Sequence, residues 1–329
     1  MKSKYLLLIG LVTTLFNCKT DKLEQFIPEN HLASFQTEKP QFFDLDTLEY
    51  KTIIRKHGTK IMYYRELFDT IYKDPIQLEL TELYDFKEIL YRNIPTITTK
   101  EELLETSGVL KIKFTSNGKE LEIREGEKLI VYPPGNKLKN NDIFLSEKNS
   151  ITNIKWNLTD QNYVSISTLL GGGISKRMYI PFDALSENEK SRIKSNQIIN
   201  ADELIHLELK NELNSFVLES IKEKWINIDK FIQPEKRISF NIEENIDFSG
   251  YNAYVQYEDL KSFLFYTVNE DMLTLKNIPI KGRVNLIVVG RNLEGIFFDK
   301  INLNTISDNS EINLNMKKTS KQNLKKLFE

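Results

Sequence analysis

The sequence is poor in the residues that build disulfides, metal sites and covalent active sites. It holds one cysteine, Cys18, so no intramolecular disulfide can form, and its three histidines, His31, His57 and His206, are widely separated. No H-E-x-x-H and no G-x-S-x-G is present, which removes the usual signatures of zinc peptidases and serine hydrolases. The glycine-rich run "GGGISKR" at 171–177 does not have the spacing of a phosphate-binding loop, and we expect a hairpin or loop there. These absences predict no cofactor and no metal.

An excess of charge of one sign is also missing. The formal net charge is -2 and the sequence pI is about 6.1, so nothing indicates the basic stripe that a nucleic-acid-binding protein needs. Hydrophobic residues make up 40% and charged residues 28%, which is typical of globular domains with sizeable cores. Without disulfides, those cores alone must hold the fold together.

The N-terminus has the pattern of an export signal. Lys2 and Lys4 precede an uncharged run from Tyr5 to Phe16. A helix needs about 20 apolar residues to cross a bilayer, and this run is shorter. We therefore expect residues 1–17 to be a signal peptide.

The single cysteine stands at the end of that run. Leu15, Phe16, Asn17 and Cys18 resemble the lipobox of bacterial lipoproteins. The resemblance implies cleavage before Cys18, diacylglycerol on its sulfur and a membrane anchor of acyl chains such as palmitate, each buried methylene contributing about 0.8 kcal/mol. Because Lys19 follows the cysteine, where aspartate is associated with inner-membrane retention, we expect the outer membrane. The alternative is a lone thiol that packs as a small hydrophobe.

Strand patterns dominate the next part of the chain. After a polar tether at 18–40, we expect an N-terminal β-rich domain at 41–181. Apolar residues alternate with polar ones in "IQLELTELY" at 76–84, as in a half-buried strand. In "VLKIKFTSNGKELEI" at 109–123, Asn117 and Gly118 supply a type I′ turn between two alternating runs, which predicts a hairpin.

Helical patterns are fewer. "DFKEILYRN" at 85–93 and "TKEELLETSG" at 99–108 have helical character. Between 182 and 235 we expect a helical connector, because Leu213, Val217, Ile221 and Trp225 recur at four-residue spacing. His206 in this segment has no neighbouring metal ligand, so we interpret it as packed or solvated.

The last third returns to strands separated by turn residues, which predicts an Ig-like β domain at 236–315. The lysine-rich residues 316–329 are expected to form a frayed basic tail. The fold class is thus mainly β with a helical connector, a β-sandwich domain followed by a smaller Ig-like β-sandwich domain.

Four segments carry a family resemblance: "KHGTKIMYY", "PIQLELTEL", "PTITTKEELLETSGVLKIKFTSNGKELEI" and "KEKWINIDKF". They are similar to successive landmarks of a group of Bacteroidota envelope lipoproteins of unassigned function. The landmarks are a Gly-Thr turn at Gly58, a strand ending near Glu82, a Leu-Glu-Thr-x-Gly run at 104–108 and a Trp-Ile-Asn-x-Asp run at 225–229. Lys224 stands where that group has glycine. The resemblance implies an envelope location and a β-rich build, and it brings no activity.

Two groups of acids are candidate calcium ligands, since calcium takes several oxygen ligands. Neither has the spacing of a dedicated calcium loop, and solvated acids are the alternative. The groups are Asp44, Asp46 and Glu49, and Glu243, Glu244 and Asp247.

Tyrosines are the candidate binding residues. Tyr251, Tyr254 and Tyr257 stand close together, and tyrosines at a domain edge stack on sugars or anchor a partner protein. The alternative is that they are packing residues of a strand.

Two functions remain open. The first is a lipid-anchored envelope protein that serves as a non-catalytic scaffold or binding module for a protein or a glycan. The second is an envelope hydrolase with a carboxylate mechanism, acting on polysaccharide or peptide. A cleft with two convergent acids, one of them with a raised pKa, would favour the hydrolase. An exposed aromatic patch or an unpaired sheet edge, without such a cleft, would favour binding.

Overall fold

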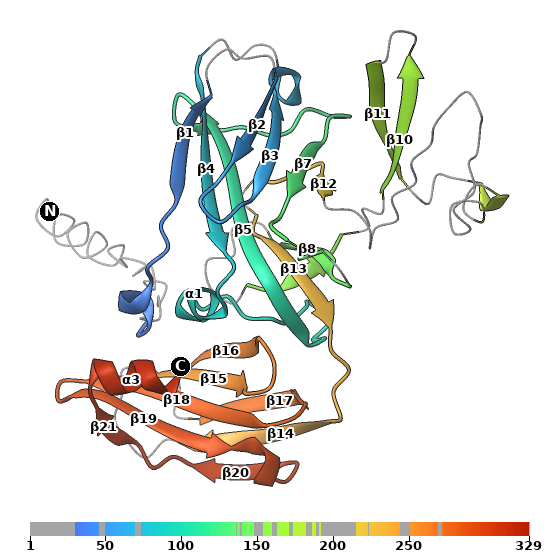
Figure 1. Cartoon of the computed structure of the whole chain (residues 1–329). Coiled ribbons are helices and arrows are strands. Elements are labelled where there is room, and N and C mark those ends of the chain that lie inside the picture. The colour runs from blue at the N-terminus through green and yellow to red at the C-terminus, as the bar shows by residue number, and fades with distance from the viewer. Residues whose placement is uncertain are drawn as a thin grey trace, which may run out of the picture.

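A computed structural model of the chain describes residues 30–45, 50–69, 74–135, 137–138, 140–147, 154–159, 163–170, 174–181, 186–188, 191, 215–222, 224–243, 251–268 and 272–328. Strands dominate these residues, as the sequence predicts (Figure 1). They pair in several sheets that are mostly antiparallel. No helix in the described part of the chain has the length and apolar character to cross a membrane.

The N-terminal domain is a sandwich of two sheets. A seven-stranded sheet has the order β1 (Gln41–Leu45), β4 (Ile76–Leu83), β5 (Leu104–Ser116), β13 (Ile226–Phe231), β8 (Asp142–Ser146) and β9 (Trp156–Leu158), with β6 (Lys119–Glu120) also on β5. A four-stranded sheet has the order β12 (Phe216–Leu218), β7 (Leu129–Tyr132), β3 (Lys60–Tyr64) and β2 (Tyr50–Ile54). One hydrophobic core, which includes Leu78, Phe114 and Val131, draws its residues from both sheets.

Period-2 alternation explains the strands of this sandwich. Ile112 and Phe114 of β5 are buried, whereas Lys111 and Lys113 between them are partly exposed. The predicted hairpin is confirmed: Asn117 (φ 49°) and Gly118 (φ 73°) both adopt the positive φ of a type I′ turn, and Ser116 pairs with Lys119 across it.

The C-terminal domain is a second, smaller sandwich. Its three-stranded sheet has the order β17 (Met272–Ile280), β14 (Lys236–Glu243) and β20 (Ser310–Asn313). Its five-stranded sheet has the order β16 (Ser262–Val268), β15 (Tyr251–Tyr257), β18 (Val284–Asn292), β19 (Gly295–Asn302) and β21 (Lys317–Thr319). The strand order differs from that of an immunoglobulin domain, whose first strand lies beside its second, because β14 pairs with β17 and β20 and not with β15.

One hairpin forms a sheet of its own. β10 (Tyr163–Leu170) pairs with β11 (Ile174–Pro181), and the register ends at Leu170 opposite Ile174. The glycines 171–173 between them lie outside the described residues.

The two described α-helices are short. α1 (Phe86–Tyr91) confirms the helix expected at 85–93, and the Asp85 side chain caps it by accepting a hydrogen bond from the Lys87 N–H at 3.0 Å. The helical character expected at 99–108 was wrong, because from Leu104 onward this segment is the start of β5, paired with Lys230 and Phe231 of β13. Strand pairing and burial outweigh helix propensity there. α3 is Lys321–Leu327, and the 3-10 turns are η1 (Ala33–Phe35), η2 (Arg65–Leu67) and η4 (Leu303–Thr305).

The helical connector expected at 182–235 is also wrong in its described second half. β12 pairs with β7, and β13 lies between β5 and β8 in the middle of the larger N-terminal sheet. The four-residue spacing of Val217, Ile221 and Trp225 thus belongs to two short strands and their connection. Most of residues 182–214, including His206, lie outside the described residues.

Both ends of the described chain are packed. Part of the expected tether at 18–40 contacts α1, since Leu32 is fully buried and the Thr37 hydroxyl donates a hydrogen bond to Glu88 at 2.6 Å. The expected frayed tail at 316–329 is instead β21 and α3, and Leu324 of α3 is fully buried. Apolar residues between the lysines explain the difference, because they cover the outer face of the five-stranded sheet.

The two sandwiches share a third core. It combines α1 and neighbouring N-terminal residues with Phe263, Phe265 and Ile287 of the C-terminal domain. Backbone hydrogen bonds cross the same boundary, from the Thr96 N–H to the Phe263 carbonyl and from the Thr106 N–H to the Lys261 carbonyl, both at 3.0 Å. Figure 1 shows the lower end of β5 and α1 above β15 and β16.

Candidate binding pocket between the two sandwiches

The three candidate tyrosines do not form a surface patch. Tyr251, Tyr254 and Tyr257 are all at most 3% exposed. The Tyr254 hydroxyl donates to the Asn93 side chain at 3.1 Å, and the Tyr257 hydroxyl donates to the Pro279 carbonyl at 2.6 Å. These rings are packing residues, because the sheet that carries them is covered on both faces.

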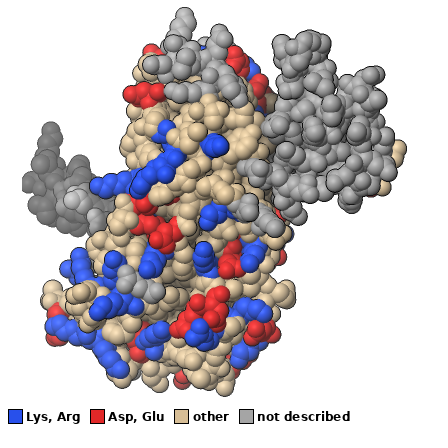
Figure 2. Space-filling view, viewed as in Figure 1, with Lys and Arg blue, Asp and Glu red and all other residues tan. Residues whose placement is uncertain are grey.

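The acidic clusters are only partly described. Asp44 is exposed and accepts a hydrogen bond from Gln77 at 3.0 Å, and Glu243 is exposed at the end of β14. Asp46, Glu49, Glu244 and Asp247 lie outside the described residues. Within the described part of the chain, no group of three or more acids, histidines or cysteines is arranged to hold a metal. Figure 2 shows basic and acidic side chains interspersed over both sandwiches on the face in view.

The landmarks of the family resemblance gather near the middle of the seven-stranded sheet. The Glu82 carboxylate accepts the backbone N–H groups of His57 and Thr59, each at 3.2 Å, and so fixes the turn at Gly58. The Thr59 hydroxyl is 2.8 Å from the Tyr84 hydroxyl, and the Tyr84 ring lies against Gly108, where any Cβ would overlap it. These residues therefore have structural roles.

The last landmark ends in a buried acid. Asp229 is fully buried on β13, where its register with β5 shifts, and its carboxyl accepts a hydrogen bond from the Asn227 amide at 2.5 Å. Burial raises the pKa of the Asp229 carboxyl to about 8, against the opposing effect of the neighbouring Thr106 and Asn227 side chains. The second carboxyl oxygen has no hydrogen-bond partner among the described residues. Asp229 does not line the pocket described next, so it is not placed to act on a ligand there.

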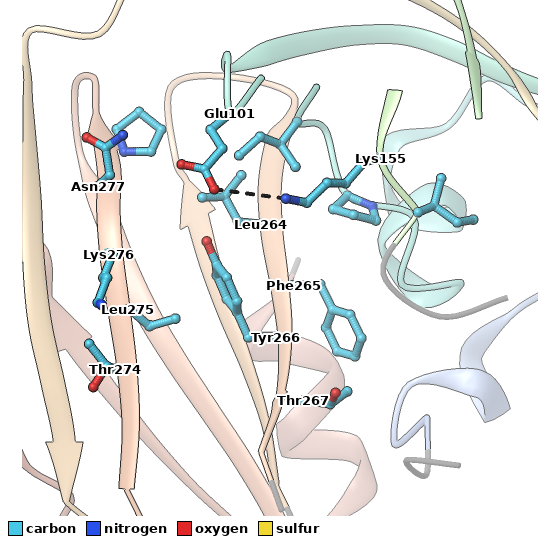
Figure 3. Close-up of a pocket in the computed structure, with 14 residues that line it drawn as sticks. Glu101, Lys155, Leu264, Phe265, Tyr266, Thr267, Thr274, Leu275, Lys276 and Asn277 are labelled. Atoms are coloured by element: carbon cyan, nitrogen blue, oxygen red, sulfur yellow. Dashed lines mark ion pairs between the residues drawn. The ribbon is translucent and has the colours of Figure 1, made fainter. Parts of the chain in front are cut away.

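The candidate site is a pocket of about 370 Å³ at the boundary of the two sandwiches (Figure 3). Its walls come from the edge strands β16 and β17 of the C-terminal sandwich and from two N-terminal segments. Pro95, Ile97, Ile154, Leu264, Phe265, Leu275 and Pro279 form its apolar part, and Glu101, Lys155, Tyr266, Thr267, Thr274, Lys276 and Asn277 supply its polar groups. A volume of this size is at the small end of the range of ligand sites.

Three polar groups meet at the mouth of the pocket. Glu101 and Lys155 form a long ion pair of 3.9 Å, and both side chains are close to half exposed, so the pair is weak. Figure 3 shows the Tyr266 hydroxyl directed toward Glu101. Burial raises the pKa of the Tyr266 hydroxyl well above its usual value, and the Glu101 charge adds to the shift, so Tyr266 is a neutral hydrogen-bonding group at any physiological pH.

One guanidinium holds two walls of the pocket together. Arg237 donates to the Asn277 carbonyl and to the Glu101 carbonyl, both at 2.9 Å. Asn277 (φ 59°) and Glu101 (φ 61°) both lie in the left-handed region, which costs free energy for residues other than glycine. Arg237 thus fixes the position of an N-terminal loop against β17 at the place where the pocket forms.

Sequence reasoning did not find this pocket. Its residues are spread from Pro95 to Pro279, and none stands in a recognisable motif. The available signal was weak: a proline in strand material, such as Pro279, indicates a sheet edge.

Neither a protein-family profile nor a curated protein matches the chain. Among solved structures, it has a weak likeness to a non-hemolytic pneumolysin from Streptococcus pneumoniae strain ST306, with 8% sequence identity and a TM-score of 0.14. The alignment covers 84% of this chain and 66% of the pneumolysin chain. A TM-score this low carries no argument about fold or function.

Proposed function

We propose that this chain is a lipid-anchored protein of the bacterial cell envelope, in the outer membrane, and that its folded part is a non-catalytic scaffold or binding module for a protein or a glycan. One observation carries the binding function. The pocket between the sandwiches is bordered by two edge strands, β16 and β17, each paired with one strand among those described, and Glu101 is the one carboxylate among its described lining residues.

The same observation counts against the hydrolase. A carboxylate mechanism needs two acids that converge on one bond, at about 5–10 Å from each other. Among the described residues that line the pocket, Glu101 has no second acid beside it and is paired with Lys155. No described feature favours the hydrolase over binding.

The membrane anchor is supported by the sequence alone. Cys18 lies outside the described residues, and the support is its place after a basic and then apolar N-terminal run. An anchored protein with a pocket in its folded part suits capture of a partner that is itself in the envelope.

The binding function is tested by site-specific photo-crosslinking in cells. Thr274 is exposed and lines the pocket, and we expect a photoreactive amino acid at this position to give a light-dependent adduct with an envelope component. The control position is Lys119, which is exposed in β6, just beyond the end of β5 that lies about 40 Å from the sandwich boundary. Adducts at neither position, or equal adducts at both, would contradict a binding site in the pocket.

A further inference from the structure

The pocket touches strand edges and not strand faces. Side chains alternate between the two faces of a strand, so a cavity over one face contacts every second residue. Here, all of 264–267 on β16 and all of 274–277 on β17 line the pocket. A ligand in it therefore meets the backbone of both edges.

The β16 edge already binds an extended segment at one end. The Thr96 N–H donates to the Phe263 carbonyl at 3.0 Å, and the Phe263 N–H donates to the Thr96 hydroxyl at 2.9 Å. Phe263 thus turns its backbone groups away from β15. Because these directions alternate along an antiparallel strand, Phe265 and Thr267 turn theirs the same way.

Those two residues extend the same edge into the pocket. The backbone groups of Phe265 and Thr267 make no hydrogen bond to a described residue beyond their own sheet. An unpaired row of N–H and C=O groups next to a cavity is the arrangement that strand addition requires. The segment around Thr96 ends where this free edge begins.

The side chains around the edge suit an apolar anchor better than a sugar. Leu264 and Leu275 are packed in the C-terminal core, and Ile97 and Ile154 face them from the N-terminal domain. Sugars are usually held by an open aromatic face. The two rings in this lining are engaged elsewhere, since Phe265 packs in the core between the sandwiches and Tyr266 packs against the core of the C-terminal sandwich.

We propose that the pocket binds an extended peptide segment of a partner protein, which pairs with the β16 edge at Phe265 and Thr267 and places one apolar side chain against the partly exposed Ile97 in the apolar part of the lining. This inference rests on the proposed binding function and names the class of its ligand. Tyr266, Lys155 and Glu101 at the mouth supply hydrogen bonds to polar groups that flank the anchor.

The experiment uses the purified full-length chain and a blocked hexapeptide of alternating threonine and valine as the probe. Affinity is measured by fluorescence polarisation, and protection of individual amides by hydrogen exchange. We expect saturable binding and slower exchange at Phe265 and Thr267. Thr267→Pro removes one edge N–H without touching the pairing with β15, so it should weaken binding about tenfold or more. Thr267→Val keeps that N–H and should change the affinity less than twofold.

If the Thr267→Pro chain does not fold, a second measurement on the wild-type chain tests the inference. The wild-type chain is titrated with the same peptide carrying N-methyl groups at alternate residues, which cannot donate to the edge. Loss of binding to the methylated peptide supports strand addition. Equal binding of both peptides, or unchanged binding by a folded Thr267→Pro chain, overturns it.

The same chain is also titrated with an N-acetylglucosamine tetramer. Saturable binding of the tetramer in place of the peptide, unaffected by Thr267→Pro, overturns the peptide inference and leaves the binding function standing. A third outcome is that neither probe binds and that the Phe265 and Thr267 amides are already protected from exchange in the free chain. The β16 edge would then be occupied within the chain itself. The peptide inference and the proposal that the pocket is a binding site would both fail.

Discussion

Individual polar residues in the N-terminal sandwich are fixed by buried contacts. Glu82 holds the backbone of the turn at Gly58, and Tyr84 leaves no room for a side chain at 108. Asp229 differs from these residues because its carboxyl is fully buried, with one short hydrogen bond from Asn227 among the described residues. Burial raises the pKa of this carboxyl, so its protonation couples the stability of the fold to pH.

Asp229 should make the stability of the fold fall as pH rises. An unfolded aspartate has a pKa of about 3.9, whereas burial raises the pKa of folded Asp229 to about 8. Between these values only the folded chain keeps the proton, so the free energy of unfolding decreases with rising pH and levels off above about 8. Asp229→Asn does not titrate, and we expect it to remove about 3–4 kcal/mol of this decrease between pH 5 and pH 8. Urea unfolding at the two pH values measures the difference.

Asp44→Asn is the matched control, because Asp44 is an exposed carboxylate on the same sheet. It removes a surface carboxylate and leaves Asp229 in place, so the decrease in stability that is assigned to Asp229 should remain. Parallel curves for the wild type and Asp229→Asn would mean that Asp229 is ionised in the folded chain.

Secondary-structure elements were predictable from the sequence where local chemistry alone decides them. The turn at Asn117 and Gly118 and the helix capped by Asp85 depend on neighbours in the chain, and both are confirmed. The first part of β5 and the strand β13 lie in segments whose sequence pattern predicts a helix. They form strands because they pair with each other. Partners more than 100 residues apart leave no local pattern, so neither the first part of β5 nor β13 was predicted.

The C-terminal helix was missed for a related reason. The lysines of 316–329 suggested a frayed, solvated tail. Leu324 and Phe328, however, lie on one face of the segment and pack on the outer face of the five-stranded sheet. The Phe328 ring contacts the Tyr254 ring edge-on, with centroids 5.1 Å apart. The sequence shows the apolar pair but not the surface that receives it.

Leu324→Ala should destabilise the fold by about 2–4 kcal/mol, because Leu324 is fully buried and its loss leaves a cavity. Urea unfolding followed by circular dichroism measures the change. Gln322→Ala in the same helix is the control, since Gln322 is exposed, and it should be neutral. If both variants unfold like the wild type, α3 is not docked in solution.

The complete chain carries a pocket that neither the family resemblance nor the strand patterns indicated. It exists because two sandwiches meet and because Arg237 joins carbonyls from both of them. Of the tyrosines that sequence analysis favoured, Tyr254 is buried because the N-terminal domain and α3 cover the outer face of its sheet, whereas Tyr251 and Tyr257 face the core of the C-terminal sandwich. Only the three-dimensional arrangement distinguishes a packed tyrosine from a binding one.

The proposed anchor concerns the whole protein and its place in the cell. We expect the membrane fraction to yield a mature N-terminal peptide that begins at Cys18 and carries two or three acyl chains, seen by intact mass. Cys18→Ala should abolish this peptide, because the sulfur that receives the lipid is gone. Lys22→Ala keeps the cysteine and should leave acylation unchanged. An unmodified wild-type peptide that begins at Met1 would contradict the lipoprotein proposal.

The shared walls of the pocket have a consequence for protein engineering. Transplanting the C-terminal sandwich alone onto another carrier would bring β16, β17 and Arg237 but leave behind Ile97, Glu101 and Lys155. The recipient would present an open edge without the cavity beside it, and such edges invite aggregation. A useful graft therefore has to include the first sandwich as well.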